Sequence, residues 1–280
     1  MKGIILVNAF SGIGEHQAKR LKEEFATFGL EVPIIRNIVG NVPVDVDFCV
    51  YLDKDPYTAI ALENNGVKLF NSYQSISLCD DKMLTYLALE GRINQPLSIP
   101  ASFCYSNTEV CEEELDYIES KLGFPLVLKL NKQSRGEGVF LIENREQLKE
   151  YITRFRGIPH FYQKFISFAR GRDTRVIVVG NKVLCAMERV NEKDFRSNIE
   201  QGGVGRCIGI NDDMQNMAVE VSKKLCLEYC GIDFVTDYDG TIYLIEVNSN
   251  AFFKGIESAS GMNVARAYAR RILEVLGVAF

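Results

Sequence analysis

Hydrophobic residues form two kinds of pattern along the first hundred positions. Short continuous apolar runs indicate strands, and segments with apolar residues three or four positions apart indicate helices. The expected strands lie at 3–10, 32–36, 47–52 and 67–70, and the expected helices at 15–29 and 58–66. This alternation predicts a small α/β domain with a parallel sheet over residues 1–97.

The rest of the chain predicts two further modules of mixed strands and helices. Residues 91–100 contain two prolines and have the composition of a linker. The expected helices are 80–90, 109–122, 145–155, 213–230 and 263–276. The expected strands are 125–130, 139–142, 160–166, 174–180 and 182–190, followed by a hairpin over 231–248. The predicted class is therefore α/β (α+β), with the second and third units at 98–166 and 167–280.

Composition narrows the class of protein. The chain has 280 residues, 47% of them hydrophobic and 25% charged, which is typical of a globular protein. Its formal net charge of −5 argues against a dedicated nucleic-acid binder. No apolar run reaches the roughly 18 residues of a membrane span, and no signal peptide is evident, so we expect a cytoplasmic protein without a membrane partner.

Cysteine and histidine usage gives no indication of a zinc site. The eight cysteines include no C-x-x-C pair, and only two histidines are present. We expect reduced and mostly buried thiols. The eight positions are Cys49, Cys79, Cys104, Cys111, Cys185, Cys207, Cys226 and Cys230.

A hairpin near the C-terminus is predicted to bring two acidic residues together. The Asp-Gly pair at 239–240 is a favoured two-residue hairpin turn. Counting back from this turn pairs Val235 with Leu244, and Asp233 with Glu246.

This pairing suggests a metal site. Like charges facing each other across two strands destabilise a sheet unless a cation lies between them. Asn248 shares a strand face with Glu246, so that two carboxylates and an amide oxygen converge. Oxygen ligands favour Mg²⁺ over zinc, and phosphates and waters would complete the octahedron. The alternative is an exposed, solvated pair of Asp233 and Glu246 at a sheet edge, which the apolar strands around them disfavour.

A candidate phosphate site follows the apolar strand at 125–130. Lys129 lies one residue before the end of this strand, and the glycine-containing loop 131–138 comes next. Strands flank this loop on both sides, which distinguishes it from the Rossmann and Walker loops that open a helix. A lysine ammonium beside a loop that permits close backbone approach suits a phosphate. With a Mg²⁺ site nearby, this predicts ATP bound between two sheets. Lys82 is either a second phosphate ligand or a solvated lysine.

Arginines mark two later segments. Arg175 opens a strand and is held in position, whereas Arg170 and Arg172 are expected on a solvated loop. Arginine forks match the geometry of carboxylates and phosphates. The polar, glycine-containing segment 194–206 predicts a flexible substrate loop.

Taken in order, these motifs resemble the ATP-grasp superfamily and most closely its RimK-type ligases, which join glutamate or another amino acid to a carboxylate. The resemblance runs from about Asp80 to Leu276 through DDK, LVLK, SRGEGV, YQKFI, RDTR, DFRSN, GIDF, IEVN and GIE. It implies an ATP-grasp fold, which the first hundred residues resemble only in outline. The chain departs from the family pattern at Lys164, where glutamate is usual, and at 249–253, where SNAFF replaces a Ser-Pro-Gly turn.

The resemblance also implies roles for individual residues. The ATP site would comprise Lys82, Lys129, the loop residues Ser134, Gly136 and Gly138, the hinge residues Gln163, Lys164, Phe165 and Ile166, the ribose ligand Asp173, and Ser197. Arg175, Arg196 and Asn198 would act on the transferring phosphate. Asp233, Glu246 and Asn248 would bind Mg²⁺, with two ions expected and Mn²⁺ as an alternative.

The implied reaction is carboxylate activation by ATP. The γ-phosphoryl group passes to a carboxylate, and an amine then attacks the acyl phosphate, releasing ADP and phosphate. Catalysis would rest on positioning and charge neutralisation, with the glycine loop as a lid that excludes water. The acceptor is a protein, peptide or metabolite carboxylate, and a homo-oligomer is expected by analogy. The rival interpretations are a small-molecule kinase on the same scaffold and a nucleotide-binding module without turnover.

Overall fold

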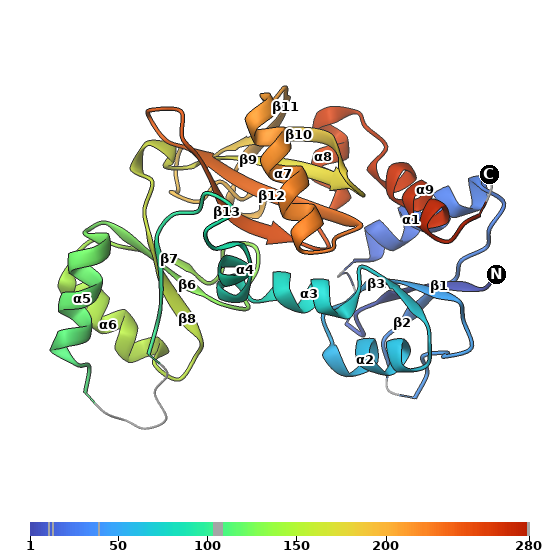
Figure 1. The fold of residues 1–280 in the computed structure, drawn as a ribbon, viewed down its shortest axis with the longest axis horizontal. Helices are drawn as coiled ribbons and strands as arrows, with labels where there is room; N and C mark the ends of the chain where they lie inside the picture. The colour runs from blue at the N-terminus through green and yellow to red at the C-terminus, as the bar shows by residue number, and fades with distance from the viewer. Residues whose placement is uncertain (11, 13, 39, 103–108, 279–280) are drawn as a thin grey trace.

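The protein is built on three separate sheets with helices packed against them. The computed structural model describes residues 1–10, 12, 14–38, 40–102 and 109–278. In Figure 1 the N-terminal sheet lies at the right, the C-terminal sheet in the upper middle and the central sheet at the left. The predicted mixed class with a parallel sheet in the N-terminal part is confirmed.

The N-terminal sheet is parallel throughout, in the order β2-β1-β3-β4. Its two central strands are buried along their whole length, because helices cover both faces, and this explains their continuous apolar runs. The strands are β1 (Gly3–Val7), β2 (Ile34–Arg36), β3 (Phe48–Leu52) and β4 (Lys68–Phe70), and the helices are α1 (Glu15–Thr27) and α2 (Pro56–Asn64).

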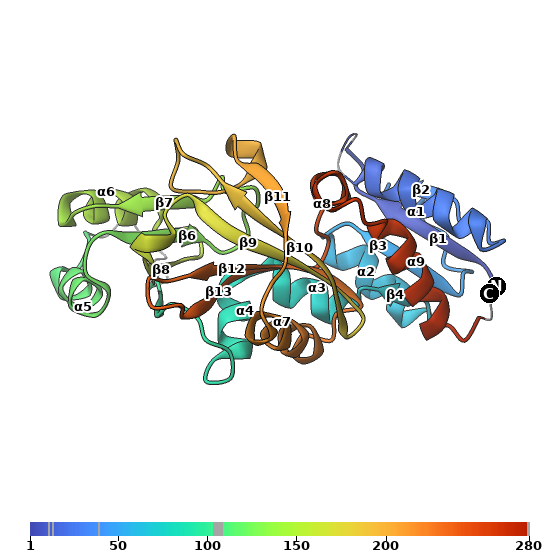
Figure 2. The ribbon, with the colours of Figure 1, turned by 90° about the horizontal axis from the view of Figure 1, so that it is seen from above.

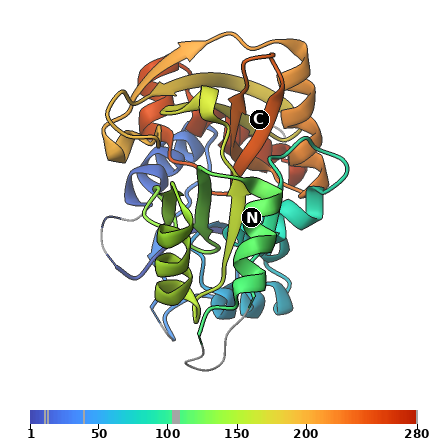
Figure 3. The ribbon, with the colours of Figure 1, turned by 90° about the vertical axis from the view of Figure 1, so that its left-hand side faces the viewer.

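The central sheet is antiparallel, in the order β5-β8-β6-β7. It consists of β5 (Ser98–Pro100), β6 (Leu126–Leu130), β7 (Val139–Ile142) and β8 (His160–Lys164). Figure 3 shows α5 (Glu112–Leu122) and α6 (Arg145–Phe155) on one side of these strands. Leu126 and Leu128 pack against these helices, so that Val127 and Lys129 lie on the opposite face.

The C-terminal sheet is antiparallel, in the order β11-β10-β9-β12-β13. Helices α4 and α7 pack against one face, and α8 packs against the other. The strands are β9 (Arg172–Val179), β10 (Lys182–Val190), β11 (Val204–Ile208), β12 (Tyr229–Thr236) and β13 (Ile242–Asn248). The helices are α3 (Tyr73–Asp80), α4 (Lys82–Leu89), α7 (Asp212–Lys224), α8 (Phe253–Ser260) and the 3₁₀ turns Ser167–Ala169 and Ile199–Gln201.

The last helix, α9 (Val264–Val275), returns to the N-terminal domain and packs beside α1 (Figure 2). The two helices share one apolar core, to which Phe25 of α1 and Tyr268 of α9 contribute fully buried rings. Because α8 and α9 directly follow β13, this packing fixes the N-terminal domain relative to the end of the C-terminal sheet.

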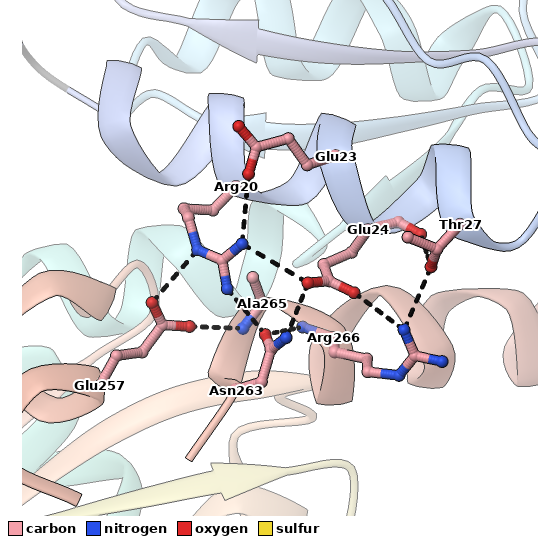
Figure 4. Close-up of polar contacts among 8 residues, drawn as sticks. All are labelled: Arg20, Glu23, Glu24, Thr27, Glu257, Asn263, Ala265 and Arg266. Atoms are coloured by element: carbon pink, nitrogen blue, oxygen red, sulfur yellow. Dashed lines mark hydrogen bonds and ion pairs between the residues drawn. The ribbon is translucent and has the colours of Figure 1, made fainter. Parts of the chain in front are cut away.

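A polar network reinforces this junction (Figure 4). Glu24 of α1 accepts a hydrogen bond from Asn263 at 2.7 Å and forms ion pairs with Arg20 and Arg266 at 3.4 and 3.2 Å. Arg20 also reaches Glu257 of α8 at 3.3 Å. Glu24 is buried, so its charge is compensated by these cations and the amide instead of by water.

Several expected elements differ from the structure. The helix expected at 213–230 ends at Lys224, because residues 229–236 pair with β9 and β13 as a strand. The helix expected at 80–90 is α4, but the helix α3 that precedes it was not expected; Asp81, the N-cap of α4, separates the two. The expected flexible loop 194–206 includes the start of β11, which pairs with β10. Arg172 begins β9 and does not lie in a loop.

The predicted C-terminal hairpin is only partly correct. Asp233 does pair with Glu246, but Val235 pairs with Tyr243 and not with Leu244. The connection is a loop of residues 237–241 in which the Asp237 amide donates to the Thr241 carbonyl at 2.9 Å. A bulge between the pairs Asp233–Glu246 and Phe234–Leu244 then restores the expected pairing of the two acids.

The described cysteines are free thiols, but they are not mostly buried. Cys49, Cys79 and Cys230 are buried, Cys185 is half-buried, and Cys111, Cys207 and Cys226 are exposed. Cys104 lies outside the described residues. Over the described part of the chain, no helix has the length and apolar character needed to cross a membrane.

The junction network predicts a specific loss of stability. Glu24→Ala would leave two arginines and an amide without their shared buried acceptor, so we expect the free energy of unfolding to fall by about 1–3 kcal/mol. Glu23→Ala is the matched control, because Glu23 is 66% exposed and pairs with the same Arg20; its effect should stay below about 0.5 kcal/mol. Urea unfolding measures both changes, and equal effects would contradict a structural role for the network.

Candidate active site

A cleft lies between the central and C-terminal sheets. It encloses about 810 Å³ including its open mouth, which is within the range of small-molecule sites. Val127 and Lys129 reach it from the central sheet, and Asp233 and Glu246 from the C-terminal sheet. The cleft therefore brings together residues more than a hundred positions apart in the sequence.

The floor of the cleft carries two lysines. Lys129 is buried, and burial together with the neighbouring Lys82 lowers its pKa to about 8, against the opposing effect of Glu246. The Lys82 ammonium lies 3.3 Å from the Glu246 carboxylate and donates to the Gln133 carbonyl. Lys82 is thus not the solvated lysine of the alternative interpretation, because its side chain is 9% exposed and faces the same cleft.

Behind the lysines lies a buried network of arginines and aspartates. Asp233 accepts two hydrogen bonds from Arg175 at 2.7 Å each and one from Arg189 at 2.9 Å. Arg189 also donates two hydrogen bonds to the Asp173 carboxylate, at 2.7 and 2.5 Å. Three of these four side chains, those of Asp173, Arg189 and Asp233, are at most 5% exposed. The alternative of an exposed, solvated Asp233 is therefore wrong.

The pKa values of the two aspartates are shifted in opposite directions. Burial raises the pKa of Asp173, and Arg189 only partly opposes this effect. Burial acts on Asp233 as well, but the Arg175 and Arg189 guanidinium groups outweigh it and hold its pKa near 2. The negative charge of Asp233, which the sequence argument balanced with a metal, is balanced here by two guanidinium groups.

The glycine loop closes over the cleft by contacts to the segment after β10. The Arg196 guanidinium donates to the Gly136 carbonyl at 2.8 Å, and Asp194 holds the other edge of the same guanidinium. Gly136 has φ +75°, and a Cβ there would lie 2.9 Å from the Asn198 amide oxygen, so the approach requires glycine. Gly138 has a different role: a Cβ there would collide with Gln133, and Gly138 lines none of the described cavities.

The wall at the end of β8 is more apolar. Gln163, Lys164, Phe165 and Ile166 all line the cleft. The Gln163 side chain donates to the Ser98 hydroxyl at 2.9 Å and so points along the sheet. After Lys164 the chain leaves the sheet, which brings backbone groups of the next two residues to the cleft wall.

A second cavity adjoins the cleft. Asn198 and Glu246 line both spaces, and Asn248, Arg175 and Ser134 face the second cavity. Its far wall comes from the N-terminal domain through Asn8, Gly14, Gln17, Asp53 and Lys54. The cleft and the second cavity thus meet at a boundary that two polar side chains form.

Comparison with known proteins assigns the chain to a family. The sequence model of the RimK-like ATP-grasp domain matches residues 79–272. The chain belongs to the RimK-like ATP-grasp family. This confirms the resemblance inferred from the motifs.

Relatives of known name support this membership. The chain is 29% identical to human N-acetylaspartylglutamate synthase A over 94% of its own length, and 35% identical to a probable alpha-L-glutamate ligase of Maridesulfovibrio salexigens over 72%. It spans 65% and 66% of the lengths of these two relatives. Among solved structures, the ATP-grasp ligase PsnB complexed with minimal precursor, Mg and ADP has a TM-score of 0.71 at 16% identity, with 97% of this chain and 96% of that chain covered. That similarity shows the ATP-grasp fold.

Most residues singled out from the sequence do come together in this RimK-like ATP-grasp chain. The cleft is lined by Lys82, Lys129, Gly136, Gln163, Lys164, Phe165, Ile166, Asp173, Arg196, Ser197, Asn198, Asp233 and Glu246. Ser134, Arg175 and Asn248 line the second cavity instead. Sequence reasoning missed Arg189, which pairs across the strands with Asp173 and binds both aspartates. The sequence signal for Arg189 was its charge within the predicted strand 182–190, whose middle is apolar.

The arginine network predicts that Arg189 is needed for folding. Arg189→Met would leave two buried carboxylates with a single guanidinium, so we expect the free energy of unfolding to fall by about 3–5 kcal/mol. Arg172→Met is the control, because Arg172 lies on the same sheet, is 60% exposed and pairs with Glu188; its cost should be about 1 kcal/mol or less. Urea unfolding at neutral pH compares the two, and a similar small loss in both would contradict the assignment.

Proposed function

We propose that this protein is an ATP-dependent, ADP-forming ligase that joins the amine of an amino acid to the carboxylate of an acceptor. The observation that carries the proposal is the contact of two cavities at Asn198 and Glu246. A phosphoryl donor in the cleft and a carboxylate in the second cavity would meet at this boundary. A ligase needs this arrangement, because its activated intermediate must stay beside an amine and away from water.

The cleft suits ATP in a defined orientation. The adenine would lie against the apolar wall that ends in Phe165 and Ile166, where backbone groups leave the sheet. The phosphates would extend toward Lys129 and Lys82, whose ammonium groups supply the positive charge. Asp173 lines the same cleft, but both its oxygens accept from Arg189, so the ribose contact implied by the resemblance stays a prediction.

The residues at the boundary also fit a magnesium ion. Among the residues that the structure describes, only one of the Glu246 oxygens is paired, with Lys82 at 3.3 Å, and Oδ1 of Asp233 accepts a single hydrogen bond. The amide nitrogen of Asn248 is buried with no partner in the described structure. Flipping that amide places its oxygen where the nitrogen now lies. Asp233, Glu246 and Asn248 would hold the ion, which would neutralise phosphate charge when bound. The binding of two ions, and of Mn²⁺ as an alternative to Mg²⁺, is part of the same prediction.

The chain's own residues would then assist two steps. An acceptor carboxylate, held by cations of the second cavity such as Arg175, would attack the γ-phosphorus of ATP to give an acyl phosphate and ADP. The amine would displace phosphate from the acyl carbon and lose a proton, forming the amide. Arg196 would keep the glycine loop closed through the Gly136 carbonyl, and so exclude water from the acyl phosphate.

Glutamate is our proposal for the amino acid. The relatives are named for N-acetylaspartylglutamate synthesis and for alpha-L-glutamate ligation, and another, human beta-citrylglutamate synthase B, is 33% identical over 88% of this chain. All three names contain glutamate, whereas the acceptors differ. The acceptor of this protein, whether protein, peptide or metabolite, is therefore the variable to test.

The test is a product analysis. Purified protein with MgATP, glutamate and a panel of carboxylates should release ADP only when both glutamate and an accepted carboxylate are present, and mass spectrometry should detect the amide. A stable phosphorylated product without an amide would point to a kinase, and nucleotide binding without ADP release to a module without turnover. Glu246→Gln should fold and yet lose ADP release, which excludes a contaminating ATPase as the source of activity.

Lys129 gives the proposal a pH signature. The Lys129 amine must be protonated to bind phosphate, and its pKa in the free protein is about 8. We expect the Kd for MgATP to be constant below about pH 8 and to rise above it. Lys129→Met should raise Kd about tenfold or more and abolish the pH step, because a hydrogen bond to a charged group contributes about 1.5–3 kcal/mol.

Raising the pH above 8 should weaken MgATP binding through Lys129, but it should increase the free energy of unfolding. The unfolded chain keeps the ordinary lysine pKa of 10.5, so between about pH 8 and 10.5 it binds more protons than the folded chain. The free energy of unfolding of the wild type should therefore rise with pH in this window relative to Lys129→Met. A Kd that is flat through pH 8 in both proteins would refute the phosphate role of Lys129.

A further inference from the structure

A third cavity lies where α1 and α8 begin side by side. His16 and Gln17 line it from α1, and Lys254 and Ile256 line it from α8. It is continuous with the second cavity, because both are lined by Gly14, Gln17, Arg135, Arg175 and Phe252. A molecule in the third cavity would thus reach toward the boundary at which the acyl phosphate would form.

The lining of this cavity is strongly basic. Its charged side chains are those of Arg135, Arg175, Arg189 and Lys254, and no acidic residue is among the described residues that line it. The charges of Arg175 and Arg189 are balanced by Asp173 and Asp233 on the cleft side of the sheet.

Two cations remain without an acidic partner. Within the part of the chain that the structure describes, neither Arg135 nor Lys254 lies within 4.0 Å of a carboxylate oxygen. The Arg135 guanidinium lies over the Phe252 ring, 5.6 Å from its centroid, which holds it at the mouth of the cavity. Lys254 belongs to the first turn of α8.

The N-termini of α1 and α8 add backbone N–H donors, which carry partial positive charge like the side chains of the cavity. No side chain caps the N-terminus of α1 or of α8 among the described residues, since Gly14 and Phe252 occupy the cap positions without a cap hydrogen bond. The first-turn amides of both helices are therefore available to an acceptor. The ion pair between Arg20 and Glu257 joins α1 to α8 and keeps these two ends together (Figure 4).

We propose that this third cavity binds the two carboxylates of the incoming amino acid and thereby selects a dicarboxylic one, an inference that rests on the ligase function proposed above. Two unmatched cations from two different segments of the chain suit two anionic groups. A neutral amino acid would leave one cation unmatched, and a basic side chain would be repelled. The carboxylates would be anchored beside Arg135 and Lys254, and the amine would point back toward Arg175 and the acyl phosphate.

The test measures selectivity and not only activity. We expect Lys254→Met and Arg135→Met to lower the ratio of kcat/KM for glutamate to kcat/KM for glutamine by about tenfold or more, mainly through KM for glutamate. For Lys254→Met, whose side chain lines neither the cleft nor the second cavity, the KM values for ATP and for the acceptor should stay within about twofold. Lys254→Glu should go further and favour lysine over glutamate relative to the wild type.

Lys19→Met is the matched control, because Lys19 is an exposed lysine of α1 that lines none of the described cavities; its selectivity should equal that of the wild type. Arg135 belongs to the glycine loop and Lys254 to α8, and both are exposed, so either variant alone can decide the question if the other folds poorly.

The outcomes separate this inference from the proposed function. Amide formation with unchanged glutamate selectivity in both variants would overturn the inference and leave the ligase function intact. A rise in acceptor KM with unchanged glutamate KM would also overturn it, because the cavity would then hold the acceptor. If the wild type forms no amide with any amino acid, the ligase function fails, and the inference fails with it.

Discussion

The buried chain of charges from Asp173 through Arg189 and Asp233 to Arg175 is the interaction on which the rest of the site depends. These residues come from three neighbouring strands, β9, β10 and β12, so the guanidinium groups join the strands across the face that looks into the cleft. Four charges close to one another in an apolar sheet are stable only because each has partners with good geometry. The same constraint fixes the direction in which Asp233 presents its remaining lone pair.

The N-terminal domain completes the site from the other side. Its sheet carries none of the ATP-site residues expected from the sequence, yet its loops form a wall of the second cavity and α1 forms a wall of the third. The junction of α1 with α8 and α9 determines how far these walls stand from β13. Under the proposed function, substrate choice would therefore depend on packing between the first thirty residues and the last thirty, which no local motif reveals.

The sequence predicted most element types and most of the residues that come together at the cleft, because those depend on local patterns of apolar and charged positions. It could not predict bulges. Counting from the turn at residues 180–181 would pair Asp173 with Glu188, but an irregularity between Val183 and Cys185 shifts the register by one and brings Arg189 opposite Asp173. In the C-terminal hairpin, a longer turn and a bulge compensate each other, so the count reached Glu246 correctly through a wrong intermediate pair. Bulges respond to the packing of the whole sheet, and a single sequence contains no direct signal for them.

The link between α3 and α4 has a consequence for how the cleft opens. Asn131, at the start of the glycine loop, donates to the Asp81 carboxylate at 3.0 and 3.2 Å, and its carbonyl accepts from the Lys82 amide. These bonds tie Lys82 to the central sheet, although it precedes that sheet in the chain by more than ten residues. Because α4 also packs against β13, Lys82 is held between the central and C-terminal sheets. To widen at this point, the cleft would have to break the hydrogen bonds of Asn131 or the ion pair of Lys82 with Glu246, so the two lysines stay close to each other and to Glu246.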